Sequence, residues 1–412
     1  MTCVGILHYA GPPGIGGVEV TMYHHARGLA ALGYTVRVIS GHGQDFDARI
    51  HTVVEPLLNS THPDVLAAKR SLDQGQIPPN FDALVERMVT ALDGALAGCT
   101  VCIAHNVPTL NKNLPLSVAL AQYVVSHPTR LLAWCHDLAW TNPQYLPELH
   151  DGYPWDVLRE PWPDATYVTV SEPRRHEVAQ LLGIPSESVV VAVPGVDPAE
   201  FYHWTPTTAY ITETLNLLDA DGLLLLPARL TRRKNVAFGL RVLKALRQIS
   251  GRDFRLIVTG PPGPHNPTNP GYLGELLALR DELHLNESAH FLYALGEGSE
   301  PLVPDNSTIA NLYHMADALF FPSLQEGFGI PVVEAGFAGL PVFCADIPPF
   351  HSTGQSDVHY FDPRSENIAH IAGQILDALE TDKGYRLRVR MRQQYRWSSL
   401  IRDVVVPLVE QR

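Results

Sequence analysis

Short apolar runs alternate with amphipathic stretches along most of this 412-residue chain. The second half of the chain repeats the pattern of the first. Such an alternation is typical of parallel sheets whose strands are joined by crossover helices. The apolar runs predict strands at Val4–Tyr9, Thr35–Ser40, Thr100–Ala104, Arg130–Cys135, Tyr167–Val170, Val189–Val193, Leu223–Pro227, Arg255–Thr259, Ala289–Leu292, Ala318–Pro322 and Pro341–Cys344. The sequence therefore predicts an α/β protein with two doubly wound, Rossmann-like domains.

The boundary between the halves lies at about residues 194–203, where Pro and Gly end a strand and the apolar periodicity resets. We therefore expect a first domain at residues 1–197 and a second at residues 198–394. Doubly wound sheets bind ligands at the carboxyl ends of their strands. The two domains are accordingly expected to face each other across a ligand-binding cleft.

Several connecting segments carry signals of their own. Helices are expected from Val18 to about Leu32 and over Phe81–Leu96, whereas residues 41–80 are polar, contain Pro and are expected to be irregular. The loop at residues 260–271 is rich in Pro, Gly and Asn, and loops of that length usually serve a function or move. Pro407 predicts a kink or break in the helical tail of the chain.

Charge and cysteine content exclude several classes of protein. The formal net charge of −13 argues against a nucleic-acid-binding protein that works by neutralising phosphates. No apolar run approaches the roughly 20 residues that a membrane span needs, and no secretory signal is evident at the N-terminus. Five cysteines, an odd number, suit reduced thiols, so a cytoplasmic protein is expected. Cys99 and Cys102 have redox-motif spacing, but their strand-like flanks disfavour that interpretation.

The strongest local signal in the second half is a glycine turn between a predicted strand and a predicted helix. Pro331 stands where the first helical residue is expected. Such a turn leaves the backbone N–H groups of Phe328, Gly329 and Ile330 free to meet an anion or sugar hydroxyls. Glu326 in the loop and Glu334 in the first helical turn can accept hydrogen bonds from a polyhydroxylated ligand. Alternatively, Glu334 serves only the helix dipole and Glu326 is a solvated loop charge.

A second cluster contains Arg229 and Lys234, in the loop between the strand that ends near Pro227 and a helix that begins at about Asn235. Asn235 is a good N-cap residue. Cations beside a helix N-terminus suit a diphosphate, and fixed positive charge there would stabilise a diphosphate leaving group. A plain solvated loop is the alternative, because Arg232 and Arg233 are basic as well.

Two weaker signals lie in the first half. Gly16 and Gly17 let the backbone approach a ligand closely, but the spacing is not that of a dinucleotide-binding loop, so a Rossmann dehydrogenase is disfavoured. His136 follows a predicted strand at its carboxyl end, although a single histidine is more often structural. Polar and aromatic residues at neighbouring strand ends are candidate acceptor contacts, because rings stack on sugar faces: Asn106, Trp140 and Tyr145.

No metal or hydrolase site is indicated. Asp45-Phe46-Asp47 and Asp219-Ala220-Asp221 match a D-x-D pattern, but neither follows a strand as a metal-binding motif would. No His/Cys cluster has zinc spacing. No G-x-S-x-G motif occurs, so a hydrolase triad is unsupported.

The pair Glu326-x7-Glu334 resembles the E-x7-E motif of the retaining glycosyltransferases of family 4, which have the two-domain GT-B fold. The resemblance covers most of the chain and is weak at residues 41–80. It implies that Glu334 grips the ribose of a nucleotide. It also implies that Glu326 and the amides after it lie near the transferred sugar, and that Arg229 and Lys234, followed by Asn235, clamp the diphosphate.

The resemblance has implications for the first half as well. Gly16 and Gly17 resemble the paired glycines that lie close to the diphosphate and the acceptor, and His136 resembles the histidine that contacts the donor sugar. The last helix, about residues 395–412, is implied to cross back onto the first domain.

The resemblance thus implies a metal- and cofactor-independent, retaining hexosyltransferase. It would move glucose or mannose from a nucleoside diphosphate sugar, such as UDP-glucose or GDP-mannose, to a hydroxyl-bearing acceptor. Residues 1–197 hold 11 Lys/Arg against 19 Asp/Glu, which disfavours docking on an anionic membrane and favours a small soluble acceptor such as a sugar, sugar phosphate or glycerate derivative. Two alternatives stay open: a sugar-nucleotide epimerase or hydrolase on the same fold, and a non-catalytic sugar-nucleotide-binding protein.

Overall fold

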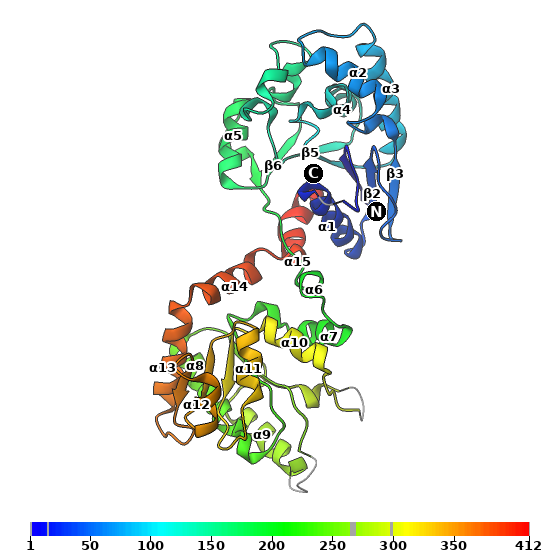
Figure 1. Cartoon of the computed structure of the whole chain (residues 1–412). Coiled ribbons are helices and arrows are strands. Elements are labelled where there is room, and N and C mark those ends of the chain that lie inside the picture. Colours follow the sequence, from blue (N-terminus) through cyan, green and yellow to red (C-terminus); the bar gives the residue numbers. More distant parts are fainter. Residues whose placement is uncertain (1, 15, 264–268, 297–299, 412) are drawn as a thin grey trace. The chain divides into compact units, whose positions relative to one another are not determined.

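The computed structural model describes residues 2–14, 16–263, 269–296 and 300–411 (Figure 1). The chain divides into two compact units. Unit 1 comprises Met1–Val196 and Tyr395–Arg412, and unit 2 comprises Asp197–Gln394. The sequence predicted that the first domain ends at residue 197, one residue later than in the structure. It placed the second boundary between residues 394 and 395, where the structure has it. None of the helices in the described segments is both long and apolar enough to cross a bilayer.

Unit 1 is built on a seven-stranded parallel sheet of order β3-β2-β1-β4-β5-β6-β7. Its strands are β1 Cys3–His8, β2 Thr35–Ser40, β3 Ile50–Val54, β4 Val101–His105, β5 Arg130–Cys135, β6 Thr166–Thr169 and β7 Val190–Val191. Its helices are α1 Gly17–Ala31, α2 Pro63–Leu72, α3 Phe81–Ala95, α4 Leu114–Ser126, α5 Glu172–Leu182, α15 Trp397–Leu400, a π-helical turn Ile401–Val405, and α16 Val406–Glu410. The expectation that residues 41–80 are irregular is wrong, because they contain β3 and α2.

The two faces of this sheet bury different partners. In β1, Val4 and Ile6 belong to the core shared with α1, whereas Leu7 belongs to the core shared with α3 and α4. This division follows from the alternation of side chains along a strand. Because helices cover both faces, the central strands are apolar on both sides, as the sequence pattern indicates.

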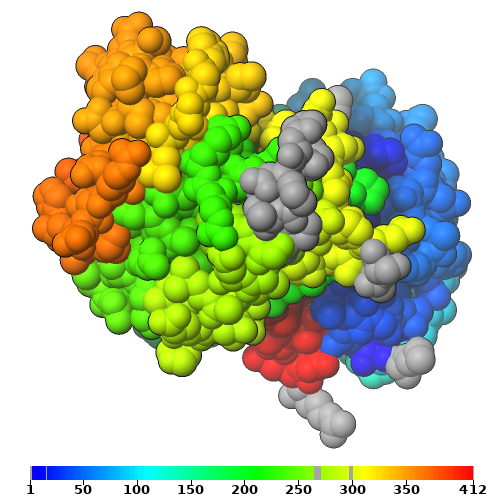
Figure 2. Space-filling model, turned by 90° about the horizontal axis from the view of Figure 1, so that it is seen from below, coloured from blue at the N-terminus to red at the C-terminus, as the bar shows by residue number. Residues whose placement is uncertain are grey.

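The C-terminal segment completes the α1 face of unit 1. Ile401 and Leu408 lie in the same core as Met22 of α1, and a Cβ on Gly28 would come within 2.3 Å of Ile401 Cδ1. Figure 2 shows the last residues, in red, against the first residues, in blue. The kink expected from Pro407 takes the form of the π-helical turn just before it, which accommodates the missing N–H of proline.

Unit 2 is built on a six-stranded parallel sheet of order β10-β9-β8-β11-β12-β13. Its strands are β8 Gly222–Leu226, β9 Phe254–Val258, β10 Ala289–Phe291, β11 Ala318–Phe321, β12 Val342–Ala345 and β13 His359–Phe361. Its helices are α6 Pro198–Phe201, α7 Pro206–Thr214, α8 Val236–Ser250, α9 Asn269–Glu282, α10 Asn306–Met315, α11 Ile330–Phe337, α12 Pro348–Gly354, α13 Ile368–Thr381 and α14 Lys383–Gln394. Helix α8 packs against α9 and α13, and α11 packs against α12 (Figure 1).

The strand order reverses once in each sheet, and these reversals place the candidate site residues. In unit 2 the reversal lies between β8 and β11, so the loops that follow these two strands lie beside each other. In unit 1 it lies between β1 and β4. Such reversals leave a crevice at the carboxyl ends of the strands, where doubly wound sheets take up ligands.

Candidate active site

The centre of the candidate site in unit 2 is an ion pair between the loop after β8 and the loop after β11. Lys234 Nζ donates a hydrogen bond to Glu326 Oε1. Arg233 Nη1 donates to Glu326 Oε2 at 3.1 Å and to the carbonyl of Gln325 at 2.9 Å. The backbone N–H of Leu324 donates to the carbonyl of Arg233 at 2.7 Å, which joins the two loops directly. The residues that the two strongest sequence signals selected independently are therefore in contact.

This ion pair is buried. Lys234 is 9% exposed, and its Nζ lies 4.7 Å from the centroid of the Phe321 ring. Burial alone would raise the pKa of Glu326, but hydrogen bonds and positive charge from Lys234 outweigh it, so the pKa falls below its ordinary value. The carboxylate is thus ionised at neutral pH. Burial lowers the pKa of Lys234, and the hydrogen bond and negative charge of Glu326 oppose this shift. A lysine ammonium has three donors, and Glu326 accepts one of them.

Arg229 differs from Lys234 in its surroundings. Its side chain is exposed, and among the described residues it has no hydrogen-bond or ion-pair partner. The backbone around it is fixed by hydrogen bonds, because the N–H of Gly260 donates to the carbonyl of Ala228 at 3.1 Å and the N–H of Leu230 donates to the carbonyl of Pro261 at 2.9 Å. A fixed backbone with an unpaired guanidinium gives a positive charge that is available to an anion. The predicted loop at 260–271 lies partly outside the described residues.

The glycine turn before α11 has the predicted form. Gly329 has a φ of +99°, and a Cβ there would meet the Phe350 ring at 2.8 Å, so this position requires glycine twice over. The backbone N–H groups of Phe328, Gly329 and Ile330 donate to no other group of the described chain. The side chains of Phe328 and Ile330 are exposed. These three amides, of which that of Gly329 belongs to a buried residue, therefore form a set of unpaired donors at the N-terminus of α11.

Glu334 is the fifth residue of α11 and lies just past its first turn, because the helix begins at Ile330, one residue earlier than expected. The hydroxyl of Tyr313 donates to Glu334 Oε2 at 2.6 Å, so the carboxylate is held by α10 rather than by the first turn of its own helix. Burial, and then the contact with Glu334, raise the pKa of Tyr313, so the phenol remains a donor. Sequence reasoning missed Tyr313, since nothing in its own segment links it to a residue 21 positions away.

An open pocket of about 410 Å³ lies beside Glu334. It is lined by residues of α10, by residues of α11 and by the residue that follows α11: Asn306, Ile309, Ala310, Tyr313, His314, Glu334, Phe337 and Ala338. Its walls combine a carboxylate with aromatic and aliphatic side chains. That combination suits a ligand with hydroxyl groups at one end and a flat apolar ring at the other.

The expected N-cap role of Asn235 is wrong in its details. Asn235 occupies the position before α8, but its φ is +56° and its side chain makes no cap hydrogen bond. Instead, Nδ2 of Asn235 donates to the carbonyl of Pro363 at 2.9 Å. Asparagine tolerates this left-handed backbone better than most residues do, and here it ties the Lys234 loop to the segment after β13.

In unit 1, His136 follows β5 at the carboxyl end of the sheet, as expected. One of its ring nitrogens, Nε2, lies 3.0 Å from Nδ1 of His105 in β4. Burial, and then the nearby His8, lower the pKa of His136 to about 4, so the ring is neutral at pH 7. Sequence reasoning did not single out His105, whose strand position resembles that of a core residue.

Asn106 does not fit the expected acceptor contact. Its side chain is 2% exposed, and Oδ1 accepts hydrogen bonds from the backbone N–H groups of His136 at 2.9 Å and Asp137 at 3.1 Å. It also adopts a left-handed φ of +58°. Asn106 therefore shapes the turn that carries His136 instead of meeting a ligand itself.

Trp140 and Tyr145 are both part-buried, and each has a cation over its ring. The guanidinium of Arg159 lies 4.0 Å from the Trp140 centroid, and Nζ of Lys112 lies 4.7 Å from the Tyr145 centroid. Trp140 Nε1 also donates to the carbonyl of Trp155 at 3.3 Å. These contacts favour a packing role for Trp140 and Tyr145. In each residue, only the ring face opposite the cation is left to stack on a sugar.

Gly16 and Gly17 form the exposed start of α1, and Gly16 is its N-cap residue. A Cβ on Gly16 would meet the Glu19 carboxylate at 2.1 Å, whereas Gly17 has open space around it. Residue 15 of this loop lies outside the described residues. At Gly16, the space that the missing Cβ leaves is thus occupied by the Glu19 side chain, from the first turn of the same helix.

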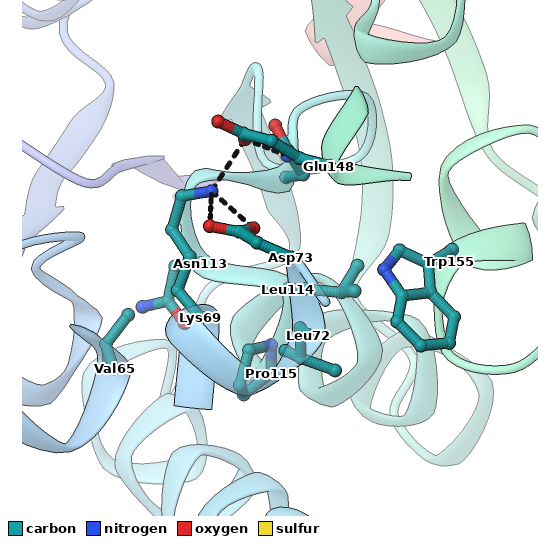
Figure 3. Close-up of a pocket in the computed structure, with 10 residues that line it drawn as sticks. Val65, Lys69, Leu72, Asp73, Asn113, Leu114, Pro115, Glu148 and Trp155 are labelled. Atoms are coloured by element: carbon teal, nitrogen blue, oxygen red, sulfur yellow. Dashed lines mark hydrogen bonds and ion pairs between the residues drawn. The ribbon is translucent and has the colours of Figure 1, made fainter. Parts of the chain in front are cut away.

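A polar cluster that the sequence did not predict joins α2 to the loops after β4 and β5. Lys69 Nζ donates to Asp73 Oδ1 at 2.7 Å and to Glu148 Oε2 at 2.6 Å, as Figure 3 shows. Asn111 Nδ2 donates to Glu148 Oε2 at 2.7 Å. Burial opposes the charge of Lys69, but its two carboxylate partners outweigh burial and raise its pKa. The cluster fastens α2, in the poorly predicted segment, to the sheet.

The D-x-D and C-x-x-C patterns serve the fold. Asp47 pairs with Arg49 at 2.6 Å, and Asp221 Oδ2 accepts from the backbone N–H of Asp253 at 2.8 Å. The Sγ of Cys99 lies 3.1 Å from that of Cys3 rather than forming a pair with Cys102.

Comparison with known proteins shows the family to which the chain belongs. A family model described as "Glycosyltransferase Family 4" matches residues 15–200, and one described as "Glycosyl transferases group 1" matches residues 212–396. An uncharacterized glycosyltransferase of Methanocaldococcus jannaschii is 23% identical over 247 residues, which cover 58% of each chain. The mannosylglucosylglycerate synthase of Petrotoga mobilis is 23% identical over 267 residues, which cover 60% of each chain.

These alignments thus span about six tenths of the length of either relative. Among solved structures, a glycosyltransferase from Rickettsia africae covers 99% of this chain and 97% of its own at 17% identity, with a TM-score of 0.36. The two family models lie end to end on the two doubly wound units. The chain belongs to the family 4-like glycosyltransferases, with their two-domain α/β GT-B fold.

Proposed function

We propose that this chain transfers a hexose from a nucleoside diphosphate sugar to an acceptor hydroxyl, with retention of the anomeric configuration and without a metal ion. The observation that carries the proposal is the buried Lys234–Glu326 pair at the strand-order reversal of unit 2, beside the free amides of α11. Family membership supports the same reaction class.

The departing diphosphate would be stabilised by Lys234 and Arg229. Negative charge grows on the leaving oxygen as the glycosidic bond breaks, so fixed positive charge lowers the barrier directly. Glu326 accepts one of the three ammonium donors of Lys234, and Arg229 is unpaired among the described residues. The N-terminus of α11 adds the amides of Phe328, Gly329 and Ile330, whose partial positive charge favours an anion.

The nucleoside would occupy the pocket beside Glu334. The Glu334 carboxylate can accept hydrogen bonds from the two ribose hydroxyls, and Tyr313 fixes its orientation at 2.6 Å. The exposed rings and aliphatic groups of the pocket suit a nucleobase. Glu326, whose two carboxylate oxygens accept hydrogen bonds from Lys234 and Arg233, is better suited to hold the clamp than to act as a nucleophile.

Retention is proposed to follow a front-side route. The acceptor hydroxyl approaches the face of the sugar that the diphosphate leaves, and its proton passes to the departing phosphate oxygen. The neutral ring of His136, in unit 1, would contact the acceptor. Four relatives are named as mannosyltransferases and two as mannosylglucosylglycerate synthases, which supports mannose or glucose and a small polar acceptor such as a glycerate derivative.

The test is an incubation of the purified chain with UDP-glucose or GDP-mannose, with and without a panel of sugars, sugar phosphates and glycerate derivatives. We expect acceptor-dependent release of the nucleoside diphosphate, a product with the anomeric configuration of the donor by NMR, and the same rate in EDTA. Rapid turnover without any acceptor would favour an epimerase or hydrolase. Binding without transfer across the whole panel would favour a non-catalytic binding protein.

A further inference from the structure

Four imidazoles gather at the carboxyl edge of the unit 1 sheet: His8 of β1, His25 of α1, His105 of β4 and His136 after β5. The ring centroids of His25 and His105 are 5.5 Å apart, and those of His105 and His136 are 5.3 Å apart. His25 and His105 are 1% and 0% exposed. The proposed reaction uses only His136, so the other three rings need a separate explanation.

The 3.0 Å contact between His105 Nδ1 and His136 Nε2 needs one donor and one acceptor. Burial places the pKa of His105 well below its ordinary value, and burial, followed by the nearby His8, lowers the pKa of His136 to about 4. Both rings of the contact are therefore neutral at pH 7, and each carries a single N–H. Which ring donates decides which nitrogen of His136 is protonated.

The unpartnered nitrogens of the cluster indicate the direction of this hydrogen bond. His105 Nε2 is buried and has no hydrogen-bond partner among the described residues, and the same holds for Trp134 Nε1 and His25 Nδ1. The centroids of the His105 and Trp134 rings are 5.6 Å apart, and the His25 ring lies beside both. Indole nitrogen is always a donor. A proton on His105 Nε2 would put a second unpaired N–H beside that of Trp134, whereas a lone pair there balances the indole donor.

We propose that His105 is a positioning residue, which donates its Nδ1–H to His136 Nε2 and thereby fixes His136 as the tautomer that carries its proton on Nδ1. Nδ1 of His136 has no hydrogen-bond partner among the described residues, and the side chain is only part-buried. His136 consequently presents an N–H to its surroundings. If the proposed transfer reaction holds, His136 donates a hydrogen bond to a sugar oxygen and does not act as a general base.

The arrangement holds His136 at two points. Its backbone N–H is bound by Asn106 Oδ1 at 2.9 Å, and its ring is bound by His105 at 3.0 Å. Asn106 and His105 are consecutive residues at the end of β4. One strand end therefore sets both the backbone and the ring of the residue that follows β5.

Nitrogen-15 NMR of the full chain with labelled histidine rings tests the assignment at pH 7, with the His136 signals identified by their loss in His136→Gln. We compare the wild type with His105→Asn, whose amide keeps a donor near the place of Nδ1, and His105→Phe, which keeps a ring without a donor. His25→Phe is the matched control, because it removes a buried ring of the cluster that makes no hydrogen bond to His136.

We expect His136 to be protonated on Nδ1 in the wild type, in His105→Asn and in His25→Phe, and to gain the Nε2-protonated form in His105→Phe. In transfer assays, kcat of His105→Phe should fall about 3- to 10-fold, the usual effect of one lost hydrogen bond. The donor KM should stay unchanged, and His105→Asn should restore kcat. Protonation on Nε2 in the wild type, or an unchanged tautomer in His105→Phe, would overturn the proposal. The NMR result does not depend on catalysis, so it stands apart from a failure of the proposed function.

Discussion

Replacing the two members of the Lys234–Glu326 pair, singly and together, separates their contribution to stability from their contribution to catalysis. Lys234→Met leaves Glu326 buried with only Arg233 as an ionic partner, at 3.1 Å. Removing one partner of a buried pair costs about 3–5 kcal/mol, and Arg233 keeps the cost near the lower end. For a unit of this size, about 3 kcal/mol lowers Tm by about 6–12 °C.

The double variant Lys234→Met/Glu326→Leu should regain most of that stability. Exchanging a whole buried pair for apolar residues of similar volume is often neutral or stabilising. Catalysis should not return with it, because the diphosphate still lacks its buried cation. Loss of such a preorganised group costs about 10²–10³ in kcat.

Thermal unfolding and initial rates of transfer from the active nucleotide sugar measure the two effects on the same preparations. The matched control is Arg232→Met, in the same loop, whose exposed guanidinium pairs with Glu275 at 2.7 Å outside the site. We expect this variant to keep both Tm and rate. A double variant that recovers stability and activity together would refute the reasoning, since the pair would then be purely structural.

Three further predictions address the turn, the nucleoside pocket and the histidine cluster. Gly329→Ala should raise the donor KM at least several-fold, because alanine at this positive φ is strained and its Cβ would displace the Phe350 ring. Gly327→Ala is the control, because its Cβ would have open space around it and should leave the donor KM unchanged. Equal KM values for the two variants would contradict the role of the turn. Tyr313→Phe should weaken nucleotide binding by about 3- to 10-fold in calorimetry with kcat unchanged, since one hydrogen bond to Glu334 is lost. Because burial lowers the folded-state pKa of His136 to about 4, the unfolded state binds more protons between pH 7 and pH 4, so stability must fall as the pH falls. Urea unfolding at pH 7 and pH 5 should show a loss of about 2 kcal/mol from this residue, smaller in His136→Gln, and a pH-independent stability would disprove it.

Much of the fold follows from patterns that are local in the sequence. Parallel strands buried on both faces are nearly continuous apolar runs, so Thr35–Ser40 and Arg130–Cys135 are predicted to the residue. Segment 41–80 fails the same test. Its strand β3 lies at a sheet edge with mixed burial, and its helix α2 is held by the Lys69 cluster, whose partners lie up to 79 residues away.

The candidate site shows the same division. Arg229, Lys234, Glu326 and Glu334 stand out by motif, and the strand order brings the first loop to the second. The contacts that these residues make are set by tertiary structure, so the roles of Tyr313 and His105 were missed. The contacts of Asn106 with two backbone N–H groups were not foreseen, because a polar residue at a strand end has the same sequence pattern whether it binds a ligand or the backbone.

The central claim is that Lys234 and Arg229 bind the diphosphate of the donor, and calorimetric titration with nucleotides tests it most directly. Uridine, guanosine and adenosine diphosphates are each compared with the corresponding monophosphate, in the wild type, Lys234→Met and Arg229→Met. For the base that binds, we predict that the wild type prefers the diphosphate at least tenfold. We predict that each variant loses most of this preference while its affinity for the monophosphate stays close to that of the wild type. An undiminished preference for the diphosphate in both variants would contradict the account.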